Sequence, residues 1–94
     1  MLIVAGHLFV DEAARERYLA DALDVIVAAR AAPGCADFHL TADPIDATRI
    51  NVFEQWDSVE DVERFRGSGP SEEQSNAIRS ASVSQHEISG STQL

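Results

Sequence analysis

The chain has 94 residues, which fits one domain with a thin core, because a domain this small buries only about 60–65% of the surface of its unfolded chain. Association enlarges such a core, so we predict a homodimer. Seven basic and sixteen acidic residues give a net charge of −9, which repels phosphate backbones and anionic headgroups and argues against nucleic acid and membrane partners.

The single cysteine, Cys35, excludes an intrachain disulfide and a cysteine-rich metal site. The apolar start of the chain is too short for a signal peptide and has no basic residue before Arg15. No metal motif, phosphate loop or nucleophile triad is present, and we expect no metal and no cofactor. We therefore expect a cytoplasmic protein with one domain over residues 1–88 and a flexible C-terminal tail over residues 89–94.

Residues 2–10 are apolar on both parities, which is typical of a strand covered on both faces. A helix is predicted from the N-cap candidate Asp11 through Arg30, because apolar residues recur at spacings of three and four. Pro33 and Gly34 end this helix, since proline cannot continue the ladder and glycine accepts a left-handed cap. The apolar stripe consists of Ala14, Tyr18, Ala22, Val25, Ile26 and Ala29, widened by Leu19 and Leu23.

Polarity alternates over residues 35–41, which predicts a second strand with Asp37 and His39 on one face and Phe38 on the other. The Asp-Pro turn that follows leads into a third strand over about residues 48–56.

Ser58, followed three residues later by Asp61, resembles a capping box and predicts a helix of about two to three turns. A second capping-box pattern over residues 71–74 predicts a short helix that includes Ile78. A weaker last strand, diluted by serines, is expected over residues 82–88.

The order of strands and helices is βαββαβ, which predicts an α+β, ferredoxin-like fold with a four-stranded antiparallel sheet and both helices on one face. The first strand is apolar on both sides, so the helix-free face should not stay in water. Pairing with the sheet of a second copy would bury this face and form a dimeric α/β barrel around a lumen.

Several pieces of the sequence form a set: Ala32-Pro33-Gly34-Cys35, then Phe38, Asp43-Pro44, and residues 49–56 (Arg-Ile-Asn-Val-Phe-Glu-Gln-Trp) with Ser58. Together they resemble the antibiotic biosynthesis monooxygenase (ABM) domain family. The resemblance covers residues 2–88 and implies a dimeric α+β barrel that oxidises a small aromatic or quinol with O₂ and without a cofactor. It places Trp56 near the pocket mouth and Asn51 or Glu54 on the lining strand. Where many members carry a histidine in the helix after the tryptophan, this chain has Phe65 or Arg66.

Oxygenation without a cofactor requires a dry pocket, a base for the phenol or quinol, and a donor that stabilises the resulting anion. Histidine suits the base because its pKa of about 6.5 lies near working pH. We predict His7 as the base and Asn51 and Arg66 as polar catalytic anchors. Substrate contacts are predicted for Trp56, Phe38, Glu54 and His86.

Each of these residues also has a structural interpretation. His7 could be a satisfied core histidine, Trp56 a packing anchor and Arg66 a solvated residue at a helix end. Asn51 could make an edge or dimer hydrogen bond, and Glu54 could pair with Arg49 of the other subunit. His39, which shares its face with Asp37, is expected at a solvent-exposed surface or a dimer rim.

Two other functions stay open, a ligand-binding or stress-associated dimer without catalysis and a haem-degrading monooxygenase. The haem alternative is less favoured because the predicted short helices lack a histidine for axial ligation. The enzyme interpretation predicts that His7, Asn51, Trp56 and Arg66 open onto one cavity, and it fails if they point to different surfaces.

Overall fold

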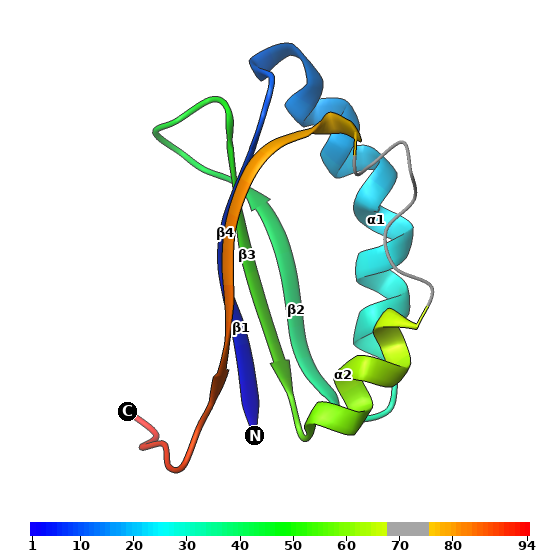
Figure 1. Cartoon of the computed structure of the whole chain (residues 1–94), viewed down its shortest axis with the longest axis vertical. Coiled ribbons are helices and arrows are strands. Elements are labelled where there is room, and N and C mark those ends of the chain that lie inside the picture. Colours follow the sequence, from blue (N-terminus) through cyan, green and yellow to red (C-terminus); the bar gives the residue numbers. More distant parts are fainter. Residues whose placement is uncertain (68–75) are drawn as a thin grey trace.

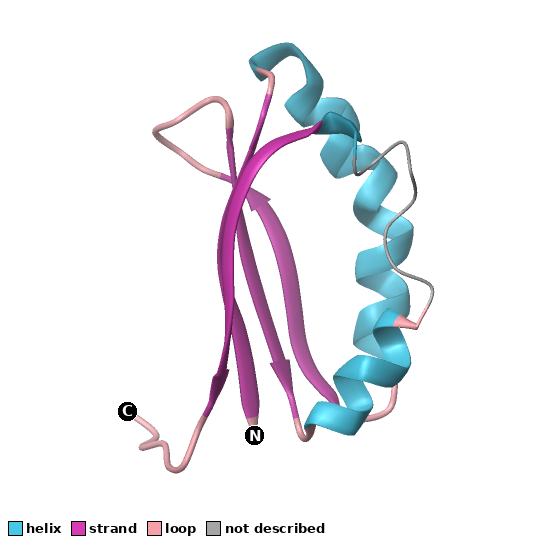
Figure 2. Ribbon diagram, viewed as in Figure 1, coloured by secondary structure: helices cyan, strands magenta, loops and turns pink. Residues whose placement is uncertain are grey.

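A computed structural model describes residues 1–67 and 76–94 of the chain. The strands form one antiparallel sheet in the order β2-β3-β1-β4, and both helices lie against one face of it (Figure 1). Figure 2 shows the strands curving past the helices, with the other face of the sheet uncovered. The predicted α+β, ferredoxin-like arrangement is confirmed. The elements are β1 (Leu2–Val10), a 3-10 turn η1 (Glu12–Ala14), α1 (Arg15–Ala31), β2 (Cys35–Ala42), β3 (Arg49–Trp56), α2 (Val59–Arg66) and β4 (Ile78–Glu87).

Residues alternate between the two faces of the sheet, because side chains in a strand have a period of two. On β1 and β3 the even-numbered positions other than Gly6 are buried beneath the helices, among them Ile50 and Trp56, which are 0% exposed. The odd-numbered positions are half-buried and form the helix-free face. This face includes Ile3, Ala5, His7 and Phe9 of β1 and Arg49, Asn51, Phe53 and Gln55 of β3.

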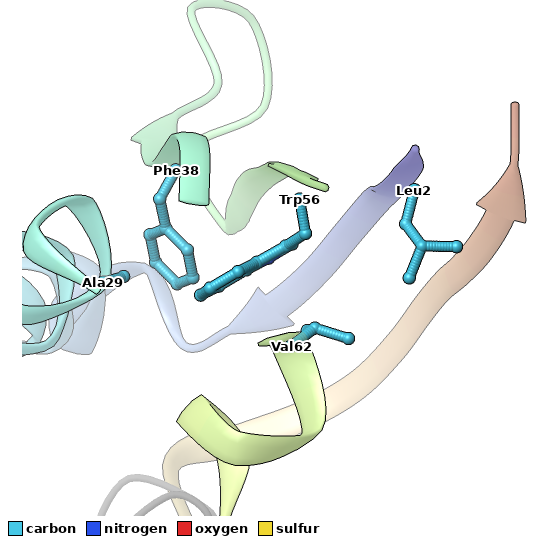
Figure 3. Close-up of a cluster of buried hydrophobic side chains, with 5 residues drawn as sticks. All are labelled: Leu2, Ala29, Phe38, Trp56 and Val62. Atoms are coloured by element: carbon cyan, nitrogen blue, oxygen red, sulfur yellow. The ribbon is translucent and has the colours of Figure 1, made fainter. Parts of the chain in front are cut away.

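The core consists of two clusters on the helix-covered side. The first, here the Trp56 cluster, contains Leu2, Ala29, Phe38, Trp56 and Val62, and the indole of Trp56 lies at its centre (Figure 3). The second, here the Ile50 cluster, contains Leu8, Val10, Ile50 and Val52. Burial of these side chains provides the main driving force for packing the helices on the sheet.

Local signals in the sequence place the helix ends. Gly34 has φ +83°, and a Cβ there would overlap the carboxylate of Asp61, so glycine is needed where this turn meets α2. The side chain of Ser58 accepts a hydrogen bond from the backbone N–H of Asp61 at 3.3 Å, as the capping box predicts. No helix in the described part of the chain has both the length and the apolar character needed to cross a bilayer.

Predictions near the first helix and the last strand need correction. Asp11 makes no side-chain cap, because its carboxylate pairs with Arg79 at 2.8 Å instead. Ile78 begins β4, opposite Val10, rather than ending a helix, and β4 therefore runs from 78 to 87 rather than from 82 to 88. Hydrogen bonding to β1 forms the strand although its serines weaken the alternation of polar and apolar residues. Residues 71–74, where that helix was predicted to begin, lie outside the described residues.

The buried stripe of α1 is narrower than its periodicity predicts. Only Ala22 and Ala29 are fully buried, while Leu23 is 58% exposed. Small residues at the contact let the helix approach the sheet closely, and it packs mainly over β2. The helix-facing sides of β1 and β4 are consequently left with room for a cavity.

Candidate functional site

A cavity of about 700 Å³ lies between the sheet and the helices, within a single chain. All four strands and both helices contribute to its walls, which are mainly apolar. The cavity joins the two core clusters, because Phe38 lines it from the Trp56 cluster, and Leu8 and Val52 line it from the Ile50 cluster. Its size and apolar lining are typical of small-molecule sites.

Glu54 is the buried carboxylate of this cavity, with 7% of the residue exposed. Its Oε1 accepts one hydrogen bond from Trp56 Nε1 at 3.0 Å and another from Arg66 Nη2 at 3.2 Å. Within residues 1–67 and 76–94, no donor is bonded to Oε2. The charge of Glu54 is thus compensated and one oxygen is held in place, while the other can accept a proton or a hydrogen bond from a ligand.

The register of the sheet explains this geometry. Val4 pairs with Glu54 on one side and with Gln85 on the other, so these three side chains form a row across β3, β1 and β4. Arg66, the last residue of α2, reaches across the row and also donates to Gln85 Oε1 at 3.5 Å. A cation at this position is favoured by the negative end of the helix dipole.

Tyr18 is a polar residue of the cavity lining that the sequence analysis placed only in the apolar stripe of the helix. It lies on α1 and packs against the Ile50 cluster. Burial raises the pKa of its hydroxyl, so the group stays protonated at neutral pH and can donate a hydrogen bond. The signal in the sequence was a phenolic hydroxyl within an otherwise aliphatic stripe. The sequence analysis also did not single out Asp24, which lines the cavity, or Gln85, which accepts a hydrogen bond from Arg66, because α1 and β4 carry many polar residues.

The predicted site residues fall on both faces of the sheet. Phe38, Glu54 and Arg66 line the cavity. Trp56 is fully buried behind the cavity wall and donates a hydrogen bond to Glu54. His7, Asn51 and His86 lie on the helix-free face, where His7 is opposite Asn51 and Ser82 and His86 is opposite Ile3. The expectation that His7, Asn51, Trp56 and Arg66 open onto one cavity is therefore wrong, and the enzyme interpretation fails in the form that made His7 the base, because a ligand in this cavity cannot contact His7.

Asn51 lies on β3, and its side chain bonds to the turn between β2 and β3. Its Nδ2 donates to Asp43 Oδ1 at 2.9 Å, and its Oδ1 accepts from Arg49 Nε at 2.7 Å. The backbone N–H of Asp46, the amide of Asn51 and the N–H of Ile45 lower the pKa of Asp43 to about 2. These contacts favour the structural interpretation of Asn51.

The ion pair expected between Glu54 and Arg49 of another subunit needs correction. Glu54 pairs with Arg66 of its own chain, and Arg49 lies on the opposite face of the sheet. The error arose because parity along one strand shows which residues share a face but does not identify the face that the helices cover.

His39 lies on the helix-free face beside Asp37, as the alternation predicts. Its Nε2 is 2.7 Å from Asp37 Oδ2, and this hydrogen bond lowers the pKa of Asp37. All three histidines of the chain, His7, His39 and His86, thus lie on the helix-free face.

Comparison with known proteins agrees with this architecture. A candidate antibiotic biosynthesis monooxygenase from Nitrosomonas europaea superposes with a TM-score of 0.82 at 12% identity, over 96% of this chain and 100% of that one. Another from Caulobacter crescentus gives 0.81 at 17% identity, over 95% and 90%. At these identities the likeness establishes the fold alone. No functionally curated protein matches significantly. The family model for antibiotic biosynthesis monooxygenase matches residues 1–78, and the chain therefore belongs to the antibiotic biosynthesis monooxygenase family.

Proposed function

We propose that the protein is a cofactor-independent monooxygenase that oxidises an uncharged aromatic or quinol with O₂ in this cavity, and that it works as a cytoplasmic homodimer. The observation that supports the proposal is the Glu54–Arg66 pair, a compensated carboxylate at the wall of a mainly apolar cavity. The reaction needs no external reductant. A quinol and one O₂ give a hydroxyquinone and one water, because the quinol itself supplies the electrons that reduce the second oxygen atom.

Glu54 and Arg66 have complementary roles in the proposed proton transfer. Oε2 of Glu54 accepts the proton of a substrate hydroxyl, while Trp56 and Arg66 hold Oε1 in place. The negative charge moves from Glu54 to the substrate, so the total charge beside the guanidinium of Arg66 does not change. Arg66 therefore stabilises the substrate anion that reacts with O₂, within a cavity where electrostatic interactions are stronger than in water.

The charges of the lining favour a neutral substrate over an anionic one. Asp24 and Glu54 carry negative charge and Arg66 carries positive charge, which leaves an excess of one negative charge among the described lining residues. The net charge of −9 acts in the same direction.

The predicted roles of His7 and His86 require a different binding place. They apply only if the substrate binds against the helix-free face, in a chamber closed by a second copy. The haem alternative gains no support from the cavity, because the described part of its lining contains no histidine that could be an axial ligand.

A ligand-binding or stress-associated dimer without catalysis is the second candidate. The specific observation in its favour is that Arg66 already neutralises Glu54 and that histidine, the usual base near neutral pH, is absent from the described lining. Such a protein would keep the cavity and its hydrogen bonds but would not turn over a substrate.

The test is oxygen uptake by the purified, metal-free protein with a panel of hydroquinones and phenols. Glu54→Gln keeps the shape of the side chain and should lower kcat/KM at least about 100-fold. His7→Ala is the matched comparison on the opposite face and should leave the rate unchanged. If His7→Ala lowers the rate and Glu54→Gln does not, the catalytic residues lie on the helix-free face. Binding of the panel without turnover of any member would favour the second candidate.

A further inference from the structure

We propose that Tyr18 is a specificity-determining residue of the cavity, whose hydroxyl binds an oxygen atom at the end of the ligand remote from Glu54 and Arg66. The inference rests on the proposed function in taking the ligand to be an oxygenated aromatic.

The two polar regions lie at different places along the sheet. Tyr18 packs against the Ile50 cluster, which includes Val52, whereas Glu54 lies beyond Val52 toward Trp56. Successive same-face residues on a strand are about 7 Å apart, so Glu54 is displaced by about 7–13 Å along β3 from Val52 and Ile50. A ligand that contacts both regions must therefore carry polar atoms at opposite ends.

The surfaces between these regions are apolar. Leu8, Leu40, Val52 and Val83 line the cavity from the four strands. Within the residues that the structure describes, the Tyr18 hydroxyl makes no hydrogen bond and is not a buried unpaired atom, so it is accessible to a ligand oxygen. The cavity thus matches an elongated, flat and uncharged aromatic ligand with an oxygen at each end.

Isothermal titration calorimetry under argon tests this inference, since binding is then measured without oxidation. The probes are 2,6-dihydroxynaphthalene, which has an oxygen at each end, and 2-naphthol, which has one. The wild-type protein should bind the diol about 3–10-fold more tightly, the range expected for one neutral hydrogen bond. Tyr18→Phe should remove this preference and leave the affinity for 2-naphthol within about 2-fold, because only the hydroxyl is lost.

Val25→Ala is the control for the cavity wall. It trims an apolar lining residue of the same helix, so both affinities should change by the same factor. The inference is overturned if Tyr18→Phe retains the preference, if it weakens both probes equally, or if neither probe binds to the folded wild-type protein. Oxygen uptake is tested separately. A diol that binds through Tyr18 but is not oxidised would refute the monooxygenase and leave the role of Tyr18 intact.

Discussion

Removing the guanidinium of Arg66, which pairs with Glu54, tests whether the cavity holds a buried charge. Arg66→Met keeps an unbranched side chain but leaves the indole N–H of Trp56 as the one donor to the carboxylate within the described residues. The side chains of Glu54 and Arg66 are 9% and 44% exposed. The pair therefore lies between exposed ion pairs, worth about 0–1 kcal/mol, and fully buried pairs, whose disruption costs about 3–5 kcal/mol. We expect Arg66→Met to lower the free energy of unfolding by about 1–3 kcal/mol, and each kcal/mol should lower Tm by about 4–8 °C.

A double-mutant cycle separates the ion pair from other effects of each substitution. Glu54→Gln together with Arg66→Met removes both charges, so the double variant should lose less stability than the two single variants combined, by about 1 kcal/mol or more. Arg17 and Asp21 provide the matched control, an exposed pair on α1 with side chains 77% and 43% exposed. Their coupling energy should be only about 0.3–0.5 kcal/mol.

Urea denaturation at pH 7 measures these free energies. Far-ultraviolet circular dichroism and the fluorescence of Trp56, the only tryptophan, give two independent signals of unfolding. If Arg66→Met changes stability by less than about 0.5 kcal/mol, or if the coupling does not exceed that of the control pair, the carboxylate is well solvated. The proposed proton transfer would then lose its physical basis.

Three further predictions concern the sheet. Gly6→Ala should cost at least about 2 kcal/mol in thermal unfolding, because a Cβ there would overlap the carbonyl oxygen of Ser82 on β4, and an unchanged Tm would contradict the close approach of the strands. The pKa of Asp43 is about 2 in the folded chain against 3.8 ordinarily, so its stabilising effect is complete above pH ~4 and is lost as the pH falls toward ~2. Asp43→Asn should flatten that part of the curve of unfolding free energy against pH, and urea melts between pH 2 and 5 that match wild type would exclude this role. Phe53→Glu places a charge on the helix-free face and should yield monomers in sedimentation experiments, whereas intact dimers would show that another surface pairs.

Short-range signals in the sequence were sufficient for most of the fold. The residues after α1, Pro33 and Gly34, and the cap formed by Ser58 act within a few positions of the chain, so their structural effect can be inferred without knowing the partners. The alternation on β2 and β3 is equally local, and it correctly separated Phe38 from His39. Ile78 was misassigned because its strand is held by pairing with β1, an interaction between residues far apart in the sequence.

The candidate site depends on long-range register and was predicted only in part. Glu54 and Trp56 were correctly assigned to one face, but nothing local indicates that Gln85 lies in the same row or that Arg66 reaches it. One error was avoidable. Asn51 and Trp56 are an odd number of positions apart on one continuous strand, so the period of two already places them on opposite faces.

The structure separates the cavity from the helix-free face, whereas the sequence analysis had assigned residues of both to one site. A cavity formed within one chain does not need a second copy to close it, so the proposed dimerisation and ligand binding should be separable. The proposed proton transfer in this cavity uses Glu54 and Arg66, whereas the three histidines could act only on a ligand bound against the helix-free face. A charge on that face that breaks the dimer should consequently leave ligand affinity nearly unchanged. Loss of affinity on dissociation would mean that the true binding chamber lies between subunits.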